Sequence, residues 1–363
     1  MAMKVLKKQS NNIKIISNIL NNILLKIIII NRLISFSLNI QKLINYDSEI
    51  TIIINGKGNQ PILNNKTPIL YSMNYKDFTK LSFNTKPSEI LVNNKTIDQI
   101  DFYVYDLKEE NNTIIMKFNQ EITNCNVMFY KLTNIIMIDL TKFDFSNVIS
   151  TEYMFAECNN LLSLYLKSFN TISLLYMDYM FLGCNSLISL DLSNFYTASV
   201  IYMNDMFRDC NNLISLNLSN LFSTSSTTYM GHMFSGCKNL ISLDLSNFHT
   251  SSATNIDYMF NDCNNLISLD LSGFNTSSVI LMENMFSGCN NLISLDLSNF
   301  DKSSIDDISK MNNMFDGCSN NLKYCINKDN KSNTLLEHIN NNDYNFKSNN
   351  NNCSDFCFSK KKK

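Results

Sequence analysis

The sequence predicts a solenoid, in which one supersecondary unit repeats along the chain and each copy stacks on the next. The dipeptide Met-Phe, followed three residues after the Phe by Cys, recurs from Met154-Phe155 to Met314-Phe315, and the spacings between these Cys residues are 26, 26, 27, 26, 26 and 29 residues. Each interval also contains Leu-x-x-Leu-x-Leu, and the prolines at 61, 68 and 87 all precede the repeats. A fixed period of this length is typical of stacked repeats.

Each unit is expected to begin with a short strand. In the unit that starts at Cys263, Leu269 and Leu271 alternate with Ser268, Asp270 and Ser272. Side chains of a strand point alternately to its two faces, so this pattern predicts leucines in the core and Ser and Asp in solvent.

The second half of the unit is expected to turn back on the strand. From Val279 the apolar positions are spaced by three and four residues, as at Met282, Met285 and Cys289, which predicts short helical or 3₁₀ turns. From Cys184 on, the residue before the repeated Cys is Gly or Asp, and such a residue tolerates the left-handed backbone that ends a turn.

The full pattern MF-x-x-C-x-N-L-x-S-L-D-L-S-N-F-x-T-S-S-V-x-x-M resembles the BspA-type leucine-rich repeat surface proteins, over residues 112–326. The resemblance implies an α/β leucine-rich-repeat solenoid with one curved parallel β-sheet, and a cell-surface or secreted adhesive role. Two features depart from the family: Phe or Leu replaces the buried Asn of many leucine-rich repeats, and Tyr165 and Asn217 replace Asp at one outward position.

Four segments are expected. Residues 46–111 contain strand-like runs at 49–55, 89–92 and 102–106 and predict a small β-rich domain or cap before a solenoid of about seven to eight units at 112–326. Thr113 to Phe118 are interpreted as its atypical first unit. The Asn-rich tail at 327–363 predicts disorder.

The N-terminal segment 1–45 carries seven Lys or Arg and no acid, with two short apolar runs. It is a candidate signal peptide or membrane anchor, although Lys26 and Arg32 interrupt the apolar stretch and no cleavage site is evident. A third explanation is the codon bias of an AT-rich genome. Membrane association is therefore expected only through this segment, if at all.

The charge of the repeats argues against nucleic acid as a partner. Residues 128–326 contain 18 acids and 8 bases, and an acidic surface repels phosphate backbones.

The cysteines of the repeats are expected to be buried free thiols. Their spacing equals the repeat length, so stacked copies would lie about 5 Å apart at Cβ, farther than a disulfide prefers. Cys325, Cys353 and Cys357 lie outside this series and are a candidate disulfide set in a secreted protein. A row of identical positions offers no tetrahedral cage, so neither metal nor cofactor is expected.

Two sets of outward residues are candidate sites. The first is an acidic row, interpreted as a solvated face, with a cation site as the alternative: Asp139, Asp191, Asp244, Asp270 and Asp296. The second is the set of deviations from the repeat, since only differences between copies can confer specificity: Tyr165, Lys167, Tyr196, Asn217, Leu221 and His249. The Thr-Ser-Ser runs at Thr250 and Thr276 are interpreted as local caps.

The function expected is a non-enzymatic binding scaffold, because none of His232, His249 and His338 shares a motif with a nucleophile. Its partner would be a protein or glycan on another cell or matrix. The alternatives are an intracellular, cytoplasmic interaction scaffold and a structural surface-coat protein without a specific ligand.

Overall fold

The computed structural model describes residues 48–64, 82–98, 101–166, 171–218, 222–271, 273–297, 299–300, 311–325 and 347–348. All of these residues lie in one compact unit, Asp47–Lys363, and every regular element assigned to them is a strand. The expectations for residues 1–45 and for nearly all of the tail lie outside the described residues.

Six strands precede the repeats, and three of them, β1, β3 and β5, lie at the strand-like runs of the sequence. They are β1 (Ser48–Asn55), β2 (Gly58–Pro61), β3 (Glu89–Val92), β4 (Lys95–Ile97), β5 (Tyr103–Leu107) and β6 (Asn111–Phe118). The main sheet has the order β4-β3-β6-β1-β7-β8, and β1 pairs antiparallel with both β6 and β7. Because β6 pairs antiparallel with β1, residues 113–118 belong to this sheet and are not the first parallel unit of the solenoid.

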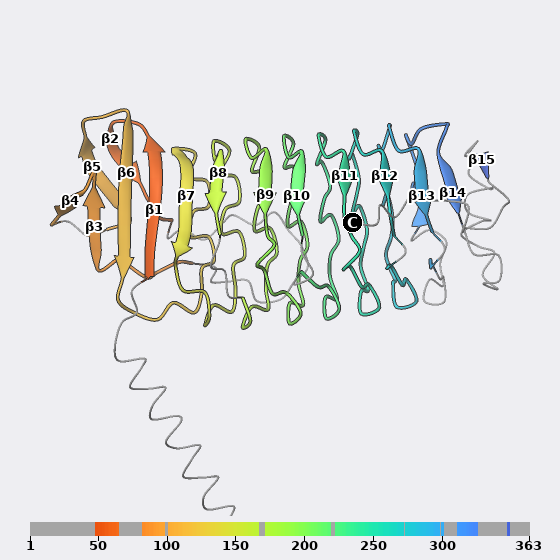
Figure 1. Cartoon of the computed structure of the whole chain (residues 1–363), viewed down its shortest axis with the longest axis horizontal. Coiled ribbons are helices and arrows are strands. Elements are labelled where there is room, and N and C mark those ends of the chain that lie inside the picture. The colour runs from red at the N-terminus through yellow and green to blue at the C-terminus, as the bar shows by residue number, and fades with distance from the viewer. Residues whose placement is uncertain are drawn as a thin grey trace, which may run out of the picture. The chain divides into compact units, whose positions relative to one another are not determined.

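The repeats form a parallel β-solenoid (Figure 1). Its strands are β7 (Ile135–Lys142), β8 (Ser163–Tyr165), β9 (Ser189–Asp191), β10 (Ser215–Asn217), β11 (Ser242–Leu243), β12 (Ser268–Leu269), β13 (Ser294–Asp296), β14 (Lys323–Cys325) and β15 (Lys347–Ser348). Equivalent residues pair in register, as Leu190 does with Leu216 and Leu243 with Leu269. We call each turn of the solenoid a rung. The predicted parallel stacking is confirmed.

A second parallel ladder runs beside the first. It consists of single bridges that link Asn124, Ser150, Tyr176, Tyr202, Tyr229, Asn255 and Leu281 in order. Each rung therefore meets the next at two separate places, which resists rotation of one rung on another.

The prediction of helical or 3₁₀ turns in the second half of each unit is wrong. Around Met154-Phe155, the N–H groups of Tyr153, Phe155 and Glu157 donate to carbonyls of the next rung. The intervening N–H groups of Met154 and Ala156 instead donate three residues back. A helix directs every N–H along its own axis, whereas here alternate N–H groups point to the neighbouring rung.

Left-handed residues cause this geometry. The residue before the repeated Cys has positive φ, as predicted, at 57° in Glu157, 67° in Gly183 and 58° in Asp209. The sequence did not reveal a second left-handed residue four positions earlier, at 55° in Tyr153 and 60° in Tyr179. Two such residues in five interrupt any run of helical backbone.

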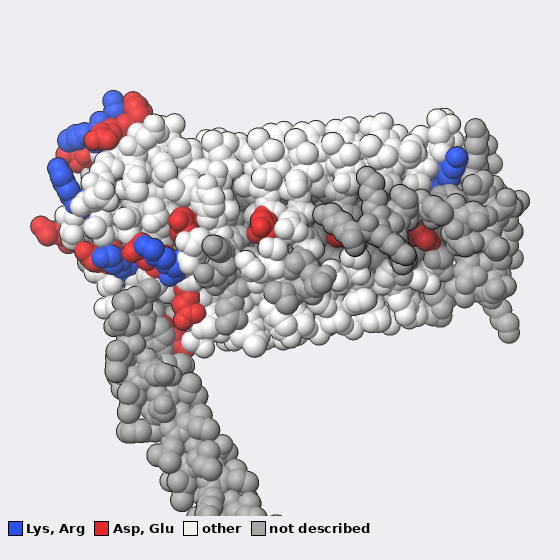
Figure 2. All heavy atoms as spheres, in the orientation of Figure 1, with Lys and Arg blue, Asp and Glu red and all other residues white. Residues whose placement is uncertain are grey.

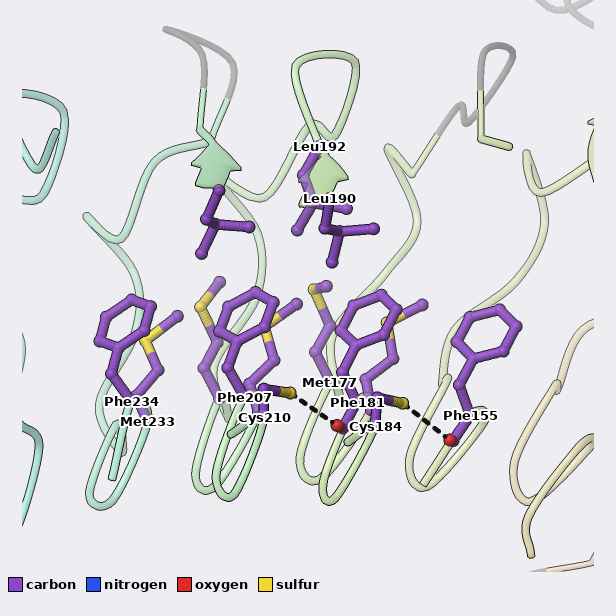
Figure 3. Close-up of a cluster of buried hydrophobic side chains, with 14 of the residues drawn as sticks. Phe155, Met177, Phe181, Cys184, Leu190, Leu192, Phe207, Cys210, Met233 and Phe234 are labelled. Carbon is purple, nitrogen blue, oxygen red and sulfur yellow. Dashed lines mark hydrogen bonds between the residues drawn. The ribbon is translucent and has the colours of Figure 1, made fainter. Parts of the chain in front are cut away.

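The core consists of identical side chains stacked from rung to rung (Figure 3). Phe155, Phe181 and Phe207 are fully buried, and their rings stack with centroids 5.4 and 5.5 Å apart. Leu190 and Leu192 also point inward, while Ser189 and Asp191 on the same strand are exposed. The predicted orientation of the strand is thus confirmed.

The repeated cysteines are free and buried, as predicted, apart from the partly buried Cys318. The Cys184 thiol donates to the carbonyl of Phe155 in the preceding rung at 3.2 Å, and Cys210 donates to Phe181 at 3.1 Å (Figure 3). Burial raises the pKa of Cys210 to about 12. The thiols therefore act as small apolar residues that also bond one carbonyl, and they are poor nucleophiles.

Buried threonines connect the rungs. This corrects the interpretation of Thr250 as a local cap, because its hydroxyl donates to the Asn275 carbonyl and accepts the Asn275 N–H, at 2.8 Å each. The Thr224 hydroxyl donates to the His249 carbonyl at 3.1 Å and accepts the His249 N–H at 2.9 Å. Thr197 makes the same pair of bonds with Ser223, at 2.8 Å each. One side chain thus bonds both backbone groups of a residue in the next rung.

Leu269→Ala should lower the free energy of unfolding by about 2–5 kcal/mol, because Leu269 is fully buried between its copies Leu243 and Leu295. The matched control is Ile267→Ala, immediately before the same strand, where the side chain is 44% exposed and the expected loss is under about 1 kcal/mol. Urea unfolding measures both. Equal losses would contradict the inward orientation of Leu269.

Thr224→Val should cost about 1–3 kcal/mol, since valine fills the space but leaves the N–H and carbonyl of His249 without their partner. Thr224→Ser keeps the hydroxyl and should recover most of the loss. Thr123→Val, at an exposed position, is the control. A valine variant as stable as the native protein would show that the bonds between rungs are dispensable.

Candidate functional site

An exposed apolar column lies immediately before the repeat strands β8 to β13. We use this name for Leu162, Ile188, Ile214, Ile241, Ile267 and Ile293, which are 44–57% exposed. The N–H of Ile214 donates to the Ile188 carbonyl at 2.8 Å, and that of Ile293 to Ile267 at 2.9 Å. Hydrogen bonds between rungs therefore hold these side chains in line along the solenoid.

The predicted acidic row lies on the same face and has a structural role. The Oδ1 atoms of Asp139, Asp191 and Asp244 accept the N–H two residues later, at 2.8, 2.9 and 3.0 Å. This is the bond of an Asx turn, which at Asp191 and Asp244 coincides with the end of the strand, whereas at Asp139 it lies within β7. Asp270 and Asp296 occupy the equivalent positions in the next rungs. We call the five residues the Asp column.

Figure 2 shows isolated Asp or Glu side chains along the solenoid, on a visible surface with little other charge. Adjacent residues of the Asp column belong to different rungs, and Asn217 interrupts it by donating its Nδ2 to Asp191 at 2.9 Å. Among the described residues, no group of three or more His, Cys, Asp or Glu side chains is placed to hold a metal ion.

The residues that deviate from the repeat lie on the strand face or where strands end. Tyr165 is 52% and Tyr196 41% exposed, and Asn217 and His249 are exposed as well. The backbones of Tyr196 and His249 bond the buried Thr171 and Thr224 of the preceding rungs. Lys167, Leu221, Cys353 and Cys357 lie outside the described residues, and for Cys325 only the strand is described.

A row of mainly polar residues lies in the turns that contain Met-Phe; Glu152 and Asp178 are buried, and Asn204 and Asp257 are partly buried. The position two residues before the Met holds Glu152, Asp178, Asn204, Gly231 and Asp257 in successive rungs. Asp178 is 4% exposed, and its Oδ1 accepts the Asn204 N–H at 2.7 Å and Nδ2 at 2.9 Å. Sequence reasoning missed this row, although acids recurring beside Met-Phe were a visible signal.

Burial and mutual repulsion raise the pKa values of these acids. Burial, with a smaller effect from Glu152, raises the pKa of Asp178 to about 8, although the bonds from Asn204 partly oppose it. Burial raises the pKa of Asp257 to about 6. Burial also raises the pKa of Asp205, where the Arg208 guanidinium, 3.0 Å away, acts in the opposite direction.

Aromatic rings stack from rung to rung in the same turns as these acids. Tyr153 and Tyr179 stack with centroids 4.4 Å apart, and His232 stacks on Tyr258 at 4.5 Å. Burial, aided by the charge of Arg208, lowers the pKa of His232 to about 4. The imidazole of His232 is therefore neutral at neutral pH, and Oδ1 of Asp178 accepts both bonds from Asn204.

The model of one protein family matches the repeats at residues 123–241 and 211–330; the family is described as "Mycoplasma protein of unknown function, DUF285". No curated protein and no solved structure matches the chain. Within the part of the chain that the structure describes, no helix has the length and apolar character needed to span a bilayer.

Asp178→Asn should stabilise the protein increasingly as pH rises. The pKa of Asp178 is about 8 in the folded state and about 4 when unfolded, so its favourable contribution is complete below about pH 4 and is lost as pH rises through about 8. The gain of Asp178→Asn over the native chain should be larger at about pH 8 than at about pH 5 by about 1 kcal/mol or more.

Urea unfolding at the two pH values measures this difference. The matched control is Asp191→Asn, because the Asp191 side chain is exposed in the folded protein. A gain at Asp178 that does not change with pH would show that this carboxyl is already ionised at about pH 5.

Proposed function

The chain belongs to the DUF285 family, and we propose that its solenoid is a non-enzymatic scaffold at the cell surface or outside the cell, where it contacts proteins or glycans. The observation that carries the proposal is that each rung separates its packing residues from its exposed ones. Leu, Phe, Met, Cys and Thr side chains are buried between rungs, and the exposed strand face is available for contact with another molecule. Extended repeat surfaces of this kind serve as binding platforms.

The resemblance to BspA-type leucine-rich repeat proteins supports adhesion as the role of this platform. Specific contact would use the deviations from the repeat, because identical rungs present identical chemistry. Tyr165 is the strongest candidate among them, since it is an exposed aromatic side chain next to the Asp column. Tyrosine is enriched among residues that dominate binding energies.

Two other functions use the same architecture. An intracellular interaction scaffold accords with the buried, reduced cysteines, which need no oxidising compartment. A surface-coat protein without a specific ligand accords with the near identity of the rungs.

The location of the protein in its own cells, with and without residues 1–45, tests the proposal. We expect surface labelling and protease sensitivity of the full chain on intact cells, and loss of both when residues 1–45 are removed. Purified full chain should also bind target cells or matrix, and Tyr165→Ala should weaken that binding severalfold.

Ile280→Ala, at an exposed position in the second half of the array and outside the apolar and Asp columns, is the control for Tyr165→Ala and should bind as the native protein does. Exclusive retention in the cytoplasm would favour the intracellular scaffold. Surface location without any cell or matrix binding would favour the coat protein.

A further inference from the structure

The packing of the solenoid does not explain the apolar column. Six aliphatic side chains in consecutive rungs are each close to half exposed. Isolated exposed isoleucines are ordinary on a protein surface, but a contiguous line of them marks a surface that another molecule covers.

The dimensions of the column favour an α-helix as its partner. Rungs of a parallel solenoid repeat at about 4.8 Å, so six rungs present apolar side chains over about 24 Å. An α-helix lying along the column would present one apolar residue per turn of about 5.4 Å, and about 16 residues would cover it. One face of an extended strand repeats at about 6.7 Å and matches the rungs less well.

The surroundings of the column determine the charge of that helix. Next to it, β9 to β13 present a line of serines and then the Asp column, from Asp191 to Asp296. Between residues 143 and 325, the described part of the chain contains 14 acids and three bases, Arg208, Lys238 and Lys323. Arg208 pairs with Asp205 in the opposite turn. A helix with Lys or Arg beside its apolar stripe would therefore be attracted to this face.

We propose that the apolar column and the Asp column together form a docking strip for a basic amphipathic α-helix of a partner protein. The inference rests on the proposed binding function and deepens it by naming the face and the class of partner. Apolar residues of the helix would pack along the isoleucines, and its basic side would lie over the Asp column. In helix-in-groove recognition, an amphipathic helix likewise packs its apolar face against an apolar surface.

The test uses the full chain and a fluorescent synthetic peptide of about 18 residues whose Leu and Lys residues form an amphipathic helix. A peptide of the same composition, scrambled to remove the apolar stripe, is the second probe. The variant Ile214→Ser/Ile241→Ser/Ile267→Ser interrupts the column. The matched control is Ile149→Ser/Ile172→Ser/Ile280→Ser, which alters three isoleucines outside the column that are 43–58% exposed.

We expect the native chain and the control variant to bind the amphipathic peptide equally, and the column variant to bind at least about tenfold more weakly. Asp244→Asn/Asp270→Asn leaves the apolar residues in place and should weaken binding and reduce its dependence on salt. Equal binding of the scrambled peptide, or an equal loss in the control variant, would overturn the proposal.

Two further measurements separate this inference from others. If the native chain sediments as a dimer that only the column variant abolishes, a second copy covers the strip and the helix proposal is wrong. If the column variant still binds cells as the native chain does, the docking strip is wrong while the scaffold function stands. Native protein that binds the peptide through the column but contacts no cell or matrix would instead contradict the proposed function.

Discussion

Hydrogen bonding between neighbouring rungs is the constraint on which the rest of the structure depends. In the turns, alternate N–H groups leave their own rung, and left-handed residues such as Tyr153 and Glu157 make this possible. The threonine hydroxyls add side-chain bonds to the next rung, and the cysteine thiols add bonds to the preceding one. Because each rung takes its partners from the next, Phe stacks on Phe and Leu on Leu, and the core has the regularity of the backbone.

The strands and their orientation were predictable because period-two alternation is a local property. Leu190 and Leu192 face inward, and the Gly or Asp before each Cys has positive φ. The turns were not predictable in the same way, since apolar spacing of three and four residues describes side-chain direction in a helix and equally in this chain of bonded turns. A helix and these turns differ in the carbonyl to which each N–H donates. That carbonyl often belongs to the neighbouring rung, so the sequence of one unit does not reveal it.

Some features of the candidate site could be predicted from a single repeat unit, and others could not. The exposure of Tyr165, Asn217 and the Asp column followed from alternation, but the Asx turns that explain Asp191 and Asp244 required atomic positions. The buried acids were missed because Asp178 looks like a solvent-facing residue in one repeat and is enclosed only when its neighbours are stacked on it. Its environment consists of other rungs, so no single unit contains the information.

The antiparallel strand β1 has a consequence for how such proteins change over generations. By covering the outer edge of β7, it ends the array at a fixed point in the chain, and every rung beyond it makes nearly the same contacts on both sides. A DNA duplication that adds one period in frame would insert a rung whose core, hydrogen bonds and apolar residue all match its neighbours. The length of the solenoid can therefore change through the number of repeats alone, while the antiparallel strands at its start stay the same.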